Sequence, residues 1–378
     1  MQLLKPKPPP YVPSEWAAKP YNERIKMACQ AWVTQGYGTP PIIYLVYGIK
    51  VLVYVAVWCW FCSFTPGLGD PWNITQWCFD ARAFQKAILW SMAFEGLGLG
   101  CASGPLTGRY FPPFGGFLYF MRPGTTKLPL FPGTPIIGRP QRSGLDIVLY
   151  GIYYLCLFRA LLAPELTADI LIPVVALLPI LGILDKTLFL VSRGEHYYVT
   201  AACFLFGEDW IAGAVAVQLA IWLWAATSKL NHHFPSVVSV MTSNSPITPW
   251  VGLRKRMYRS YPTDLRPSKL AYTVAHMGTV VEFSFPVILL MGDGGTLSLA
   301  GLTLMLGMHC YITGNVPMAV PIEWNVQVVY SAFFLFWIHA GTTPIEIGSP
   351  WLIGFLCLTL ILIPAVGHFI PSRVSFLL

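Results

Sequence analysis

Residues 185–234 read DKTLFLVSRGEHYYVTAACFLFGEDWIAGAVAVQLAIWLWAATSKLNHHF, and they set the architecture that we expect for the whole chain. The apolar, Trp-rich run from Trp210 to Ser228 is long enough to cross a bilayer as a helix. Four polar residues close it: Lys229, Asn231, His232 and His233. Ionisable residues also stand beside the apolar runs before it: Asp185, Lys186, Arg193, Glu195 and His196. Such groups are costly next to hydrocarbon unless they pair or face a cavity, so we expect functional residues here.

The composition outside this stretch is that of an integral membrane protein. Of the 378 residues, 55% are hydrophobic and 11% are charged, against about a quarter charged in soluble domains. The 14 Trp and 18 Tyr suit aromatic belts at the two membrane interfaces. The net charge of +7 comes from Lys and Arg grouped in loops between apolar runs, which is typical of cytoplasmic loops and not of nucleic-acid binding.

Apolar runs predict an all-α, polytopic helix bundle with eight or nine transmembrane helices over residues 41–378. The expected spans are Ile42–Phe64, Arg82–Cys101, Leu145–Ala163, Ile170–Val191, Trp210–Ser228, Leu270–Met291, Thr296–Ile312, Asn325–Ala340 and Trp351–Ile370. Lys86 and Glu95 in the second span are expected to face the bundle interior. Between 143 and 254 the count stays open, because Tyr197–Phe206 could cross or part of 235–253 could re-enter.

Residues 1–40 are expected to form a cytoplasmic arm. Its KPKPPP start is typical of polyproline, it has no signal-peptide core, and Ser14–Gln35 has the apolar spacing of an amphipathic helix. Two long loops rich in Gly, Pro and aromatic residues are predicted at 103–143 and 235–268. Positive residues place the N-terminus, loop 103–143, residues 254–269 and the C-terminus in the cytoplasm.

The sequence lacks the motifs of several common kinds of catalytic and metal-binding site. Nine Cys form no metal-binding pattern, and no metal site is predicted. Cys59 and Cys62 have CxxC spacing inside an apolar helix, where packing and redox chemistry both remain open. No HExxH, CxxCH, GxSxG or P-loop motif is present.

Lys229 has two interpretations. Its ammonium could extend to the interface while the stem lies along the helix, or a desolvated amine could act as a general base. Polar residues in later spans make a polar interior plausible: His276, His309, His339, His368, Glu282 and Glu323. They also leave haem or chlorin ligation open as a minor alternative. Glu282 is a candidate partner for one of the cations.

The order Asp185-Lys186-Thr187, His196-Tyr197-Tyr198 and Ala225–Asn231 resembles the membrane domain of vitamin K-dependent gamma-carboxylases, which the wider HTTM superfamily shares. His276-Met277-Gly278 and Met308-His309-Cys310 continue the resemblance, so an HTTM-like core is expected at about 145–345. The resemblance implies that Lys229 acts as base toward a reduced quinone and that His196 assists it.

The chain also resembles a domain-of-unknown-function family of bacterial multi-pass membrane proteins. This resemblance extends over nearly the whole chain and is carried by Gly36–Pro40, FEGLGLGCASGPLTGRYFPP, SKLNHHFP, MTSNSP and VPIEWNVQ. It implies a fold and a bacterial inner-membrane location.

Two functions follow as hypotheses. In the first, the bundle binds or acts on a lipid-soluble molecule, a quinone or a polyprenyl lipid, with Lys229 and His196 as catalytic residues. The expected binding residues are Asp185, Lys186, Asn231, His232, His276, Glu282 and His309. In the second, the chain is a non-catalytic subunit that binds lipid, pigment or haem and contacts other subunits through loops 103–143 and 235–253. A transporter is a third, weaker alternative, because no repeat is visible.

Overall fold

The computed structural model describes residues 5, 7–100, 115–245, 248, 250–315 and 322–370. The predicted all-α class is confirmed, since the helices and strands of the described residues are all helices apart from one short hairpin of β1 (Tyr258–Ser260) and β2 (Asp264–Pro267). The chain divides into two compact units. Unit 1 contains Met1–Leu52, Trp222–Val287 and Thr303–Ile322, and unit 2 contains Val53–Ile221, Ile288–Leu302 and Glu323–Leu378.

Six helical segments among the described residues are long and apolar enough to span a membrane. They are α3 (Ile42–Cys62), α8 (Gly144–Leu162), Gly207–Ser228 with α12 (Trp210–Ser228), α15 (Lys269–Leu290), α16 (Thr296–Thr313) and Pro350–Phe369 with α18 (Pro350–Leu356) and α19 (Ile363–Phe369). Two shorter apolar helical segments are α9 (Ala168–Leu184) and Ile322–Ile338, which begins with α17 (Ile322–Phe333). The chain is therefore an integral membrane protein, and the count of eight or nine spans is not confirmed.

Two predicted spans have different ends in the structure. Helix α5 covers Ala81–Gly96 and stops short of Cys101, because Gly98 takes a φ of 86° and closes the C-terminus. The predicted span to Val191 is broken after Leu184, where Asp185 caps the separate helix α10 (Lys186–Val191). A local capping interaction thus outweighs the continuous apolar pattern.

Unit 1 contains structure where the sequence predicted a long loop at 235–268. Helix α13 (Phe234–Asn244), helix α14 (Val251–Arg256) and the hairpin surround a small core. That core consists of Val238, Met257, Tyr258, Ala271 and Ala275. The expected amphipathic segment forms α1 (Pro13–Ala17) and α2 (Tyr21–Gln35), and α2 contacts α13 through Asn244, whose amide donates to the carbonyl of Trp32 at 3.1 Å.

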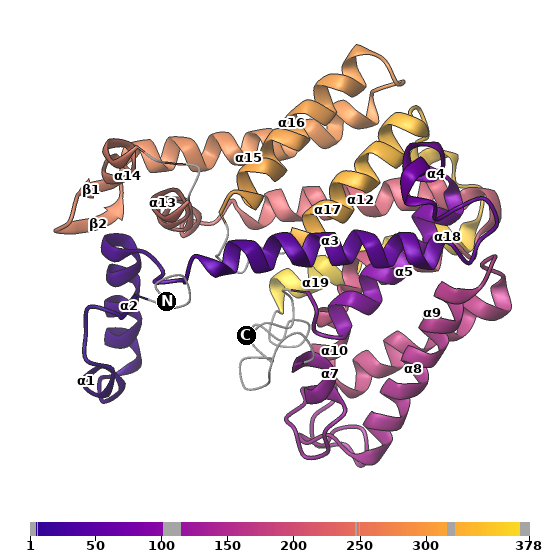
Figure 1. Ribbon diagram of the computed structural model, residues 1–378, viewed down its shortest axis with the longest axis horizontal. Coiled ribbons are helices and arrows are strands. Elements are labelled where there is room, and N and C mark those ends of the chain that lie inside the picture. Colours follow the sequence, from indigo (N-terminus) through magenta and orange to yellow (C-terminus); the bar gives the residue numbers. More distant parts are fainter. Residues whose placement is uncertain are drawn as a thin grey trace. The chain divides into compact units, whose positions relative to one another are not determined.

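Unit 2 is built around α5, α8 and α9, with α8 and α9 packed as neighbouring antiparallel helices (Figure 1). Short elements complete the unit: α4 (Ile74–Trp77), α7 (Gly115–Phe120), α10 and α11 (Val199–Cys203). Lys86 and Glu95 are buried at 1% and 0% exposure, as the sequence predicted. Stacking of Phe84 on Phe334, with ring centroids 4.2 Å apart, joins α5 to the segment after α17.

The part of loop 103–143 that the structure describes is held to unit 2 by buried ion pairs. Lys127 Nζ lies 2.6 Å from Asp146 Oδ1, and Arg142 pairs with Asp185. Thr126 and Gln141 also form an isolated bridge. Because of these contacts, residues 124–142 pack on α8 and α9 rather than forming a solvated loop, and we call them the cover loop.

Candidate functional site

Lys229 forms an ion pair with Glu282 inside unit 1. Lys229 directly follows Ser228, the last residue of α12, and Glu282 lies on α15. The Glu282 side chain is 3% exposed and that of Lys229 is 24% exposed. The Phe234 ring lies 5.9 Å from Lys229 Nζ. The prediction that Glu282 partners a cation is therefore confirmed, and the cation is Lys229.

This pairing changes the chemistry that Lys229 can perform. Removing its proton would leave the Glu282 carboxylate buried without its counter-charge, which is costly. The role of Lys229 as a general base stays a prediction, and in this structure its ammonium is held by Glu282.

Asn231 folds the turn after α12. Its side-chain oxygen accepts hydrogen bonds from the amides of His233 at 2.8 Å and Phe234 at 3.1 Å, while its amide donates to the Ser228 carbonyl. His232 is exposed, with its ring 3.7 Å from that of His233. The structure thus gives Asn231 a turn-forming role and leaves His232 at the surface of unit 1.

The two predicted late histidines differ in environment. His309 on α16 is 2% exposed, and its Nε2 accepts a hydrogen bond from the indole of Trp222 at 3.4 Å. Trp222 also packs edge-on against Phe285. His276 is exposed on α15 and lies near Tyr272. His309 is therefore part of the helix packing, whereas His276 is accessible.

Asp185 is occupied by interactions within unit 2. One carboxylate oxygen accepts from the amides of Leu128 and Thr187, each at 3.1 Å, and the other pairs with Arg142. Lys186 is half-buried and its amide donates to the Leu128 carbonyl at 2.8 Å. Asp185 consequently fixes the cover loop to the start of α10.

A second group of ionisable residues meets in the interior of unit 2, and the sequence did not predict that they meet. Arg193 Nε lies 3.1 Å from Glu95 Oε1, and its guanidinium lies 5.6 Å from the ring centroid of Trp324. The Trp324 indole donates to His196 Nδ1 at 3.2 Å. Because Nδ1 accepts, His196 is the neutral tautomer with its proton on Nε2.

Glu323 approaches the same group. A β-carbon built on Gly100 would overlap Glu95 Oε2 and lie 3.0 Å from Glu323 Oε1, so both carboxylates lie against this glycine. Glu95 and Glu323 are 0% and 1% exposed. The sequence shows that burying each of these charges is costly. No local pattern showed that Glu95 and Glu323 would lie beside each other.

The backbone at this group is unusual. Arg193 has a φ of 51°, in the left-handed region that non-glycine residues rarely adopt. A π-helical turn follows at Gly194–Tyr198 and orients His196. Strained positions and π-turns often mark functional sites. Lys229 belongs to unit 1 and His196 to unit 2.

An apolar groove runs along α3 in unit 1. Its volume is about 670 Å³, and it is lined by Tyr44, Leu45, Tyr47, Gly48, Ile49, Val51, Leu52, Thr313, Gly314 and Ile322. Gly48 has no neighbouring atom within 4 Å of the place where a side chain would start. Among the described residues, no group of three or more His, Cys, Asp or Glu side chains could hold a metal ion.

Comparison with known proteins gives one match. A family model described as "Transmembrane protein of unknown function (DUF3556)" matches residues 1–378. No curated protein and no solved structure matches the chain.

Proposed function

This chain belongs to the DUF3556 family of transmembrane proteins, and we propose that it binds a lipid-soluble molecule, of quinone or polyprenyl type, in the groove of α3. The groove is the observation that carries the proposal. Its volume of about 670 Å³ lies within the range of small-molecule sites, and its lining is almost wholly aliphatic and aromatic. An isoprenoid or acyl chain is the kind of ligand that such a lining favours.

The shape of α3 supports a bound chain rather than ordinary contact with bilayer lipid. Any spanning helix exposes apolar side chains, as Leu45 and Leu52 do at 59% and 71%. Here the absent side chain of Gly48 leaves open space on α3, and Thr313, Gly314 and Ile322 line the same groove. A chain that lies in this groove would contact residues of α3 and of the segment around Gly314, which adds dispersion contacts that a single helix surface lacks.

Filling the groove tests this function. Gly48→Trp would place an indole where the chain is proposed to lie. Gly354→Trp on α18 is a matched control, since Gly354 is also an exposed helical glycine with open space around it. We expect mass spectrometry of protein purified in mild detergent to detect a stoichiometric lipid in the wild type and the control, and to find it lost from Gly48→Trp. Equal retention in both variants would refute the proposal.

Catalysis on that molecule is a second candidate, favoured by the Lys229–Glu282 pair, which joins the end of one spanning segment to α15. Ionisable residues at this depth often serve function, since hydrocarbon makes them costly. Here Lys229 would hold an oxygen of the substrate. His196 belongs to unit 2 and is tested separately, as a donor from Nε2. Lipid profiles of membranes containing the wild type, Lys229→Ala or His196→Ala would test this. A lipid altered by the wild type must be unaltered by both variants, and a product that persists in either removes that residue.

Ligation of haem or chlorin by His309 is disfavoured by its surroundings. Its Nε2 accepts the hydrogen bond from Trp222, and the ring is enclosed in the helix packing of unit 1. An absorption spectrum of the purified protein would check this directly, since either pigment has strong visible bands.

A further inference from the structure

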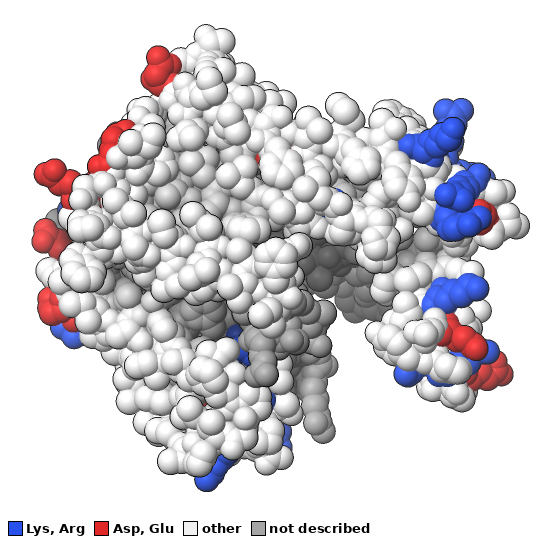
Figure 2. All heavy atoms as spheres, turned by 180° about the vertical axis from the view of Figure 1, so that it is seen from behind, with Lys and Arg blue, Asp and Glu red and all other residues white. Residues whose placement is uncertain are grey.

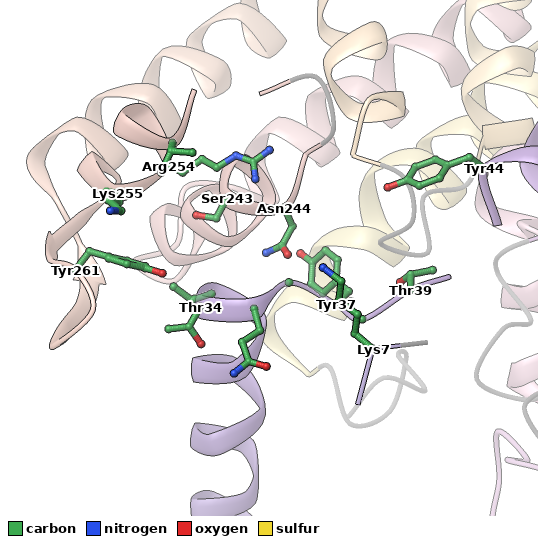
Figure 3. Close-up of a pocket in the computed structure, with 15 residues that line it drawn as sticks. Lys7, Thr34, Tyr37, Thr39, Tyr44, Ser243, Asn244, Arg254, Lys255 and Tyr261 are labelled. Atoms are coloured by element: carbon green, nitrogen blue, oxygen red, sulfur yellow. The ribbon is translucent and has the colours of Figure 1, made fainter. Parts of the chain in front are cut away.

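A second pocket in unit 1 lies beside the groove and differs from it in chemistry. It has a volume of about 370 Å³ and is formed by the end of α2, the end of α13, α14, the hairpin and Lys7 (Figure 3). Three cationic residues line it, namely Lys7, Arg254 and Lys255, and its lining contains no carboxylate. This lining is suited to an anion.

None of these three cations forms an ion pair with a carboxylate within the described ranges. Arg254 is instead fixed by backbone carbonyls, donating from Nε to Thr248 at 2.6 Å and from a terminal nitrogen to Ser245 at 3.0 Å. Carbonyls orient the guanidinium without neutralising it, so its charge remains available to a ligand. Blue side chains gather over α14 and the hairpin in Figure 2, which shows the same excess of positive charge.

Tyr37 adds a hydrogen-bond donor to the pocket. Its hydroxyl is buried and has no hydrogen-bond partner among the described residues. Burial raises the pKa of Tyr37 above its ordinary value, so the group keeps its proton at neutral pH. A buried hydroxyl without a partner is costly, and an acceptor oxygen of a ligand would remove that cost.

Two glycines hold Tyr37 in place. Gly36 and Gly38 have φ values of 82° and 71°, which glycine adopts most readily. A β-carbon on Gly38 would also lie 2.7 Å from the carbonyl oxygen of Lys7, and the Lys7 amide donates to the Gly38 carbonyl at 2.9 Å. The Gly36–Gly38 turn therefore brings Lys7 and Tyr37 to the same pocket.

Tyr44 lines both the polar pocket and the apolar groove, so the two are adjacent within unit 1. We propose that together they bind one amphiphile, a lipid with a phosphate-bearing head, whose phosphate is held by Lys7, Arg254, Lys255 and Tyr37 while its chain lies along α3. This inference rests on the proposed function and names the class of ligand. Phosphate accepts several charge-assisted hydrogen bonds at once, so it can engage more than one of these donors.

Three probes separate head from chain: dioctanoyl phosphatidic acid, dioctanoylglycerol with the same chains and no phosphate, and inorganic phosphate with no chain. Full-length protein in detergent is titrated with each. We expect the wild type to bind the phosphatidic acid at least about tenfold more tightly than either other probe, because only this probe occupies both regions.

The double variant Lys7→Gln/Lys255→Gln removes two pocket charges. Neither side chain forms a hydrogen bond within the described ranges, and Lys255 Nζ lies 5.7 Å from the centroid of the Tyr261 ring. Arg256→Gln/Arg259→Gln is the matched control, with the same loss of charge from exposed residues outside the pocket lining. Each basic group near a phosphate contributes a factor of about five, so the first variant should bind phosphatidic acid about 25-fold more weakly and dioctanoylglycerol unchanged. Tyr37→Phe should weaken phosphatidic acid alone by about fivefold.

Two results would overturn the inference. In the first, both double variants lose affinity for phosphatidic acid equally, which would show general attraction to a positive surface. In the second, the wild type binds phosphatidic acid and dioctanoylglycerol with equal affinity. Gly48→Trp separates the inference from the proposed function. Loss of both lipids in Gly48→Trp supports the groove. A different result would separate the two proposals: Gly48→Trp binds both lipids normally, while the binding of inorganic phosphate still depends on Lys7 and Lys255. The groove is then excluded as the lipid site. The pocket would bind a free phosphate compound, and the proposal of one amphiphile would be refuted.

Discussion

Replacing one member of the Lys229–Glu282 pair should destabilise the protein, whereas replacing both members by apolar residues should not. Lys229→Met leaves the Glu282 carboxylate, 3% exposed, without its counter-charge. Removal of one partner from a buried pair costs about 3–5 kcal/mol. Because Lys229 is itself 24% exposed, water can reach the site, and we expect a smaller cost than for a fully buried pair, about 2–3 kcal/mol.

Glu282→Leu alone leaves a partly exposed ammonium, which can reach the interface, and should cost less than Lys229→Met. The double variant replaces both charges by apolar groups and should return to within about 1 kcal/mol of the wild type. The coupling between the two sites is then about 2 kcal/mol, well above the few tenths expected for independent positions.

Reversible unfolding in mixed micelles, followed by helicity as denaturing detergent is added, measures all four proteins. Arg266→Met is the control, because Arg266 pairs with Asp264 at the exposed hairpin and its loss should leave the unfolding free energy unchanged. The reasoning fails if Lys229→Met matches this control, or if the double variant is no more stable than Lys229→Met.

Three further predictions concern stability, measured in the same unfolding assay. Gly38→Ala should lower the free energy of unfolding by about 2 kcal/mol and Gly67→Ala by about 1 kcal/mol. Both glycines have a positive φ, but only a β-carbon at Gly38 would meet a backbone oxygen, at 2.7 Å. Equal losses of stability in the two variants would contradict this. Asp185→Ala should cost about 3 kcal/mol by leaving a buried guanidinium unpaired, and a loss below 1 would count against the cover-loop contact. Asp80→Ala should cost about 1 kcal/mol at pH 7 by removing the cap of α5. Hydrogen bonds from Arg82 hold the pKa of Asp80 below its ordinary value, so this contribution is present above about pH 4 and is lost as the pH falls; a difference that persists in acid would refute it.

The sequence by itself determined that this is a helical membrane protein, because the length and apolarity of a run are local properties. The ends of α8 and α12 fall within a residue of their predicted positions for that reason. The sequence also showed that Lys86 and Glu95 must be buried inside the bundle, since the cost of a charge in hydrocarbon does not depend on the partner.

Helix ends were predicted less well where a single residue outweighs the pattern. Asp185 divides one apolar run into α9 and α10, and Gly98 ends α5. The loop predicted at 235–268 contains α13, α14 and the hairpin, because their short apolar segments become stable only when they pack on one another.

Only the tertiary structure decided which charges meet. Lys229 could have taken any buried carboxylate as a partner, and the fold gives it Glu282. Arg193 meets Glu95, and Glu323 lies beside the same glycine, although these residues come from distant parts of the chain. Chain spacing carries no information on such pairs, because an ion pair depends on separation in space. The sequence therefore showed that each charge needs a partner, and the packing of the helices determined which partner it found.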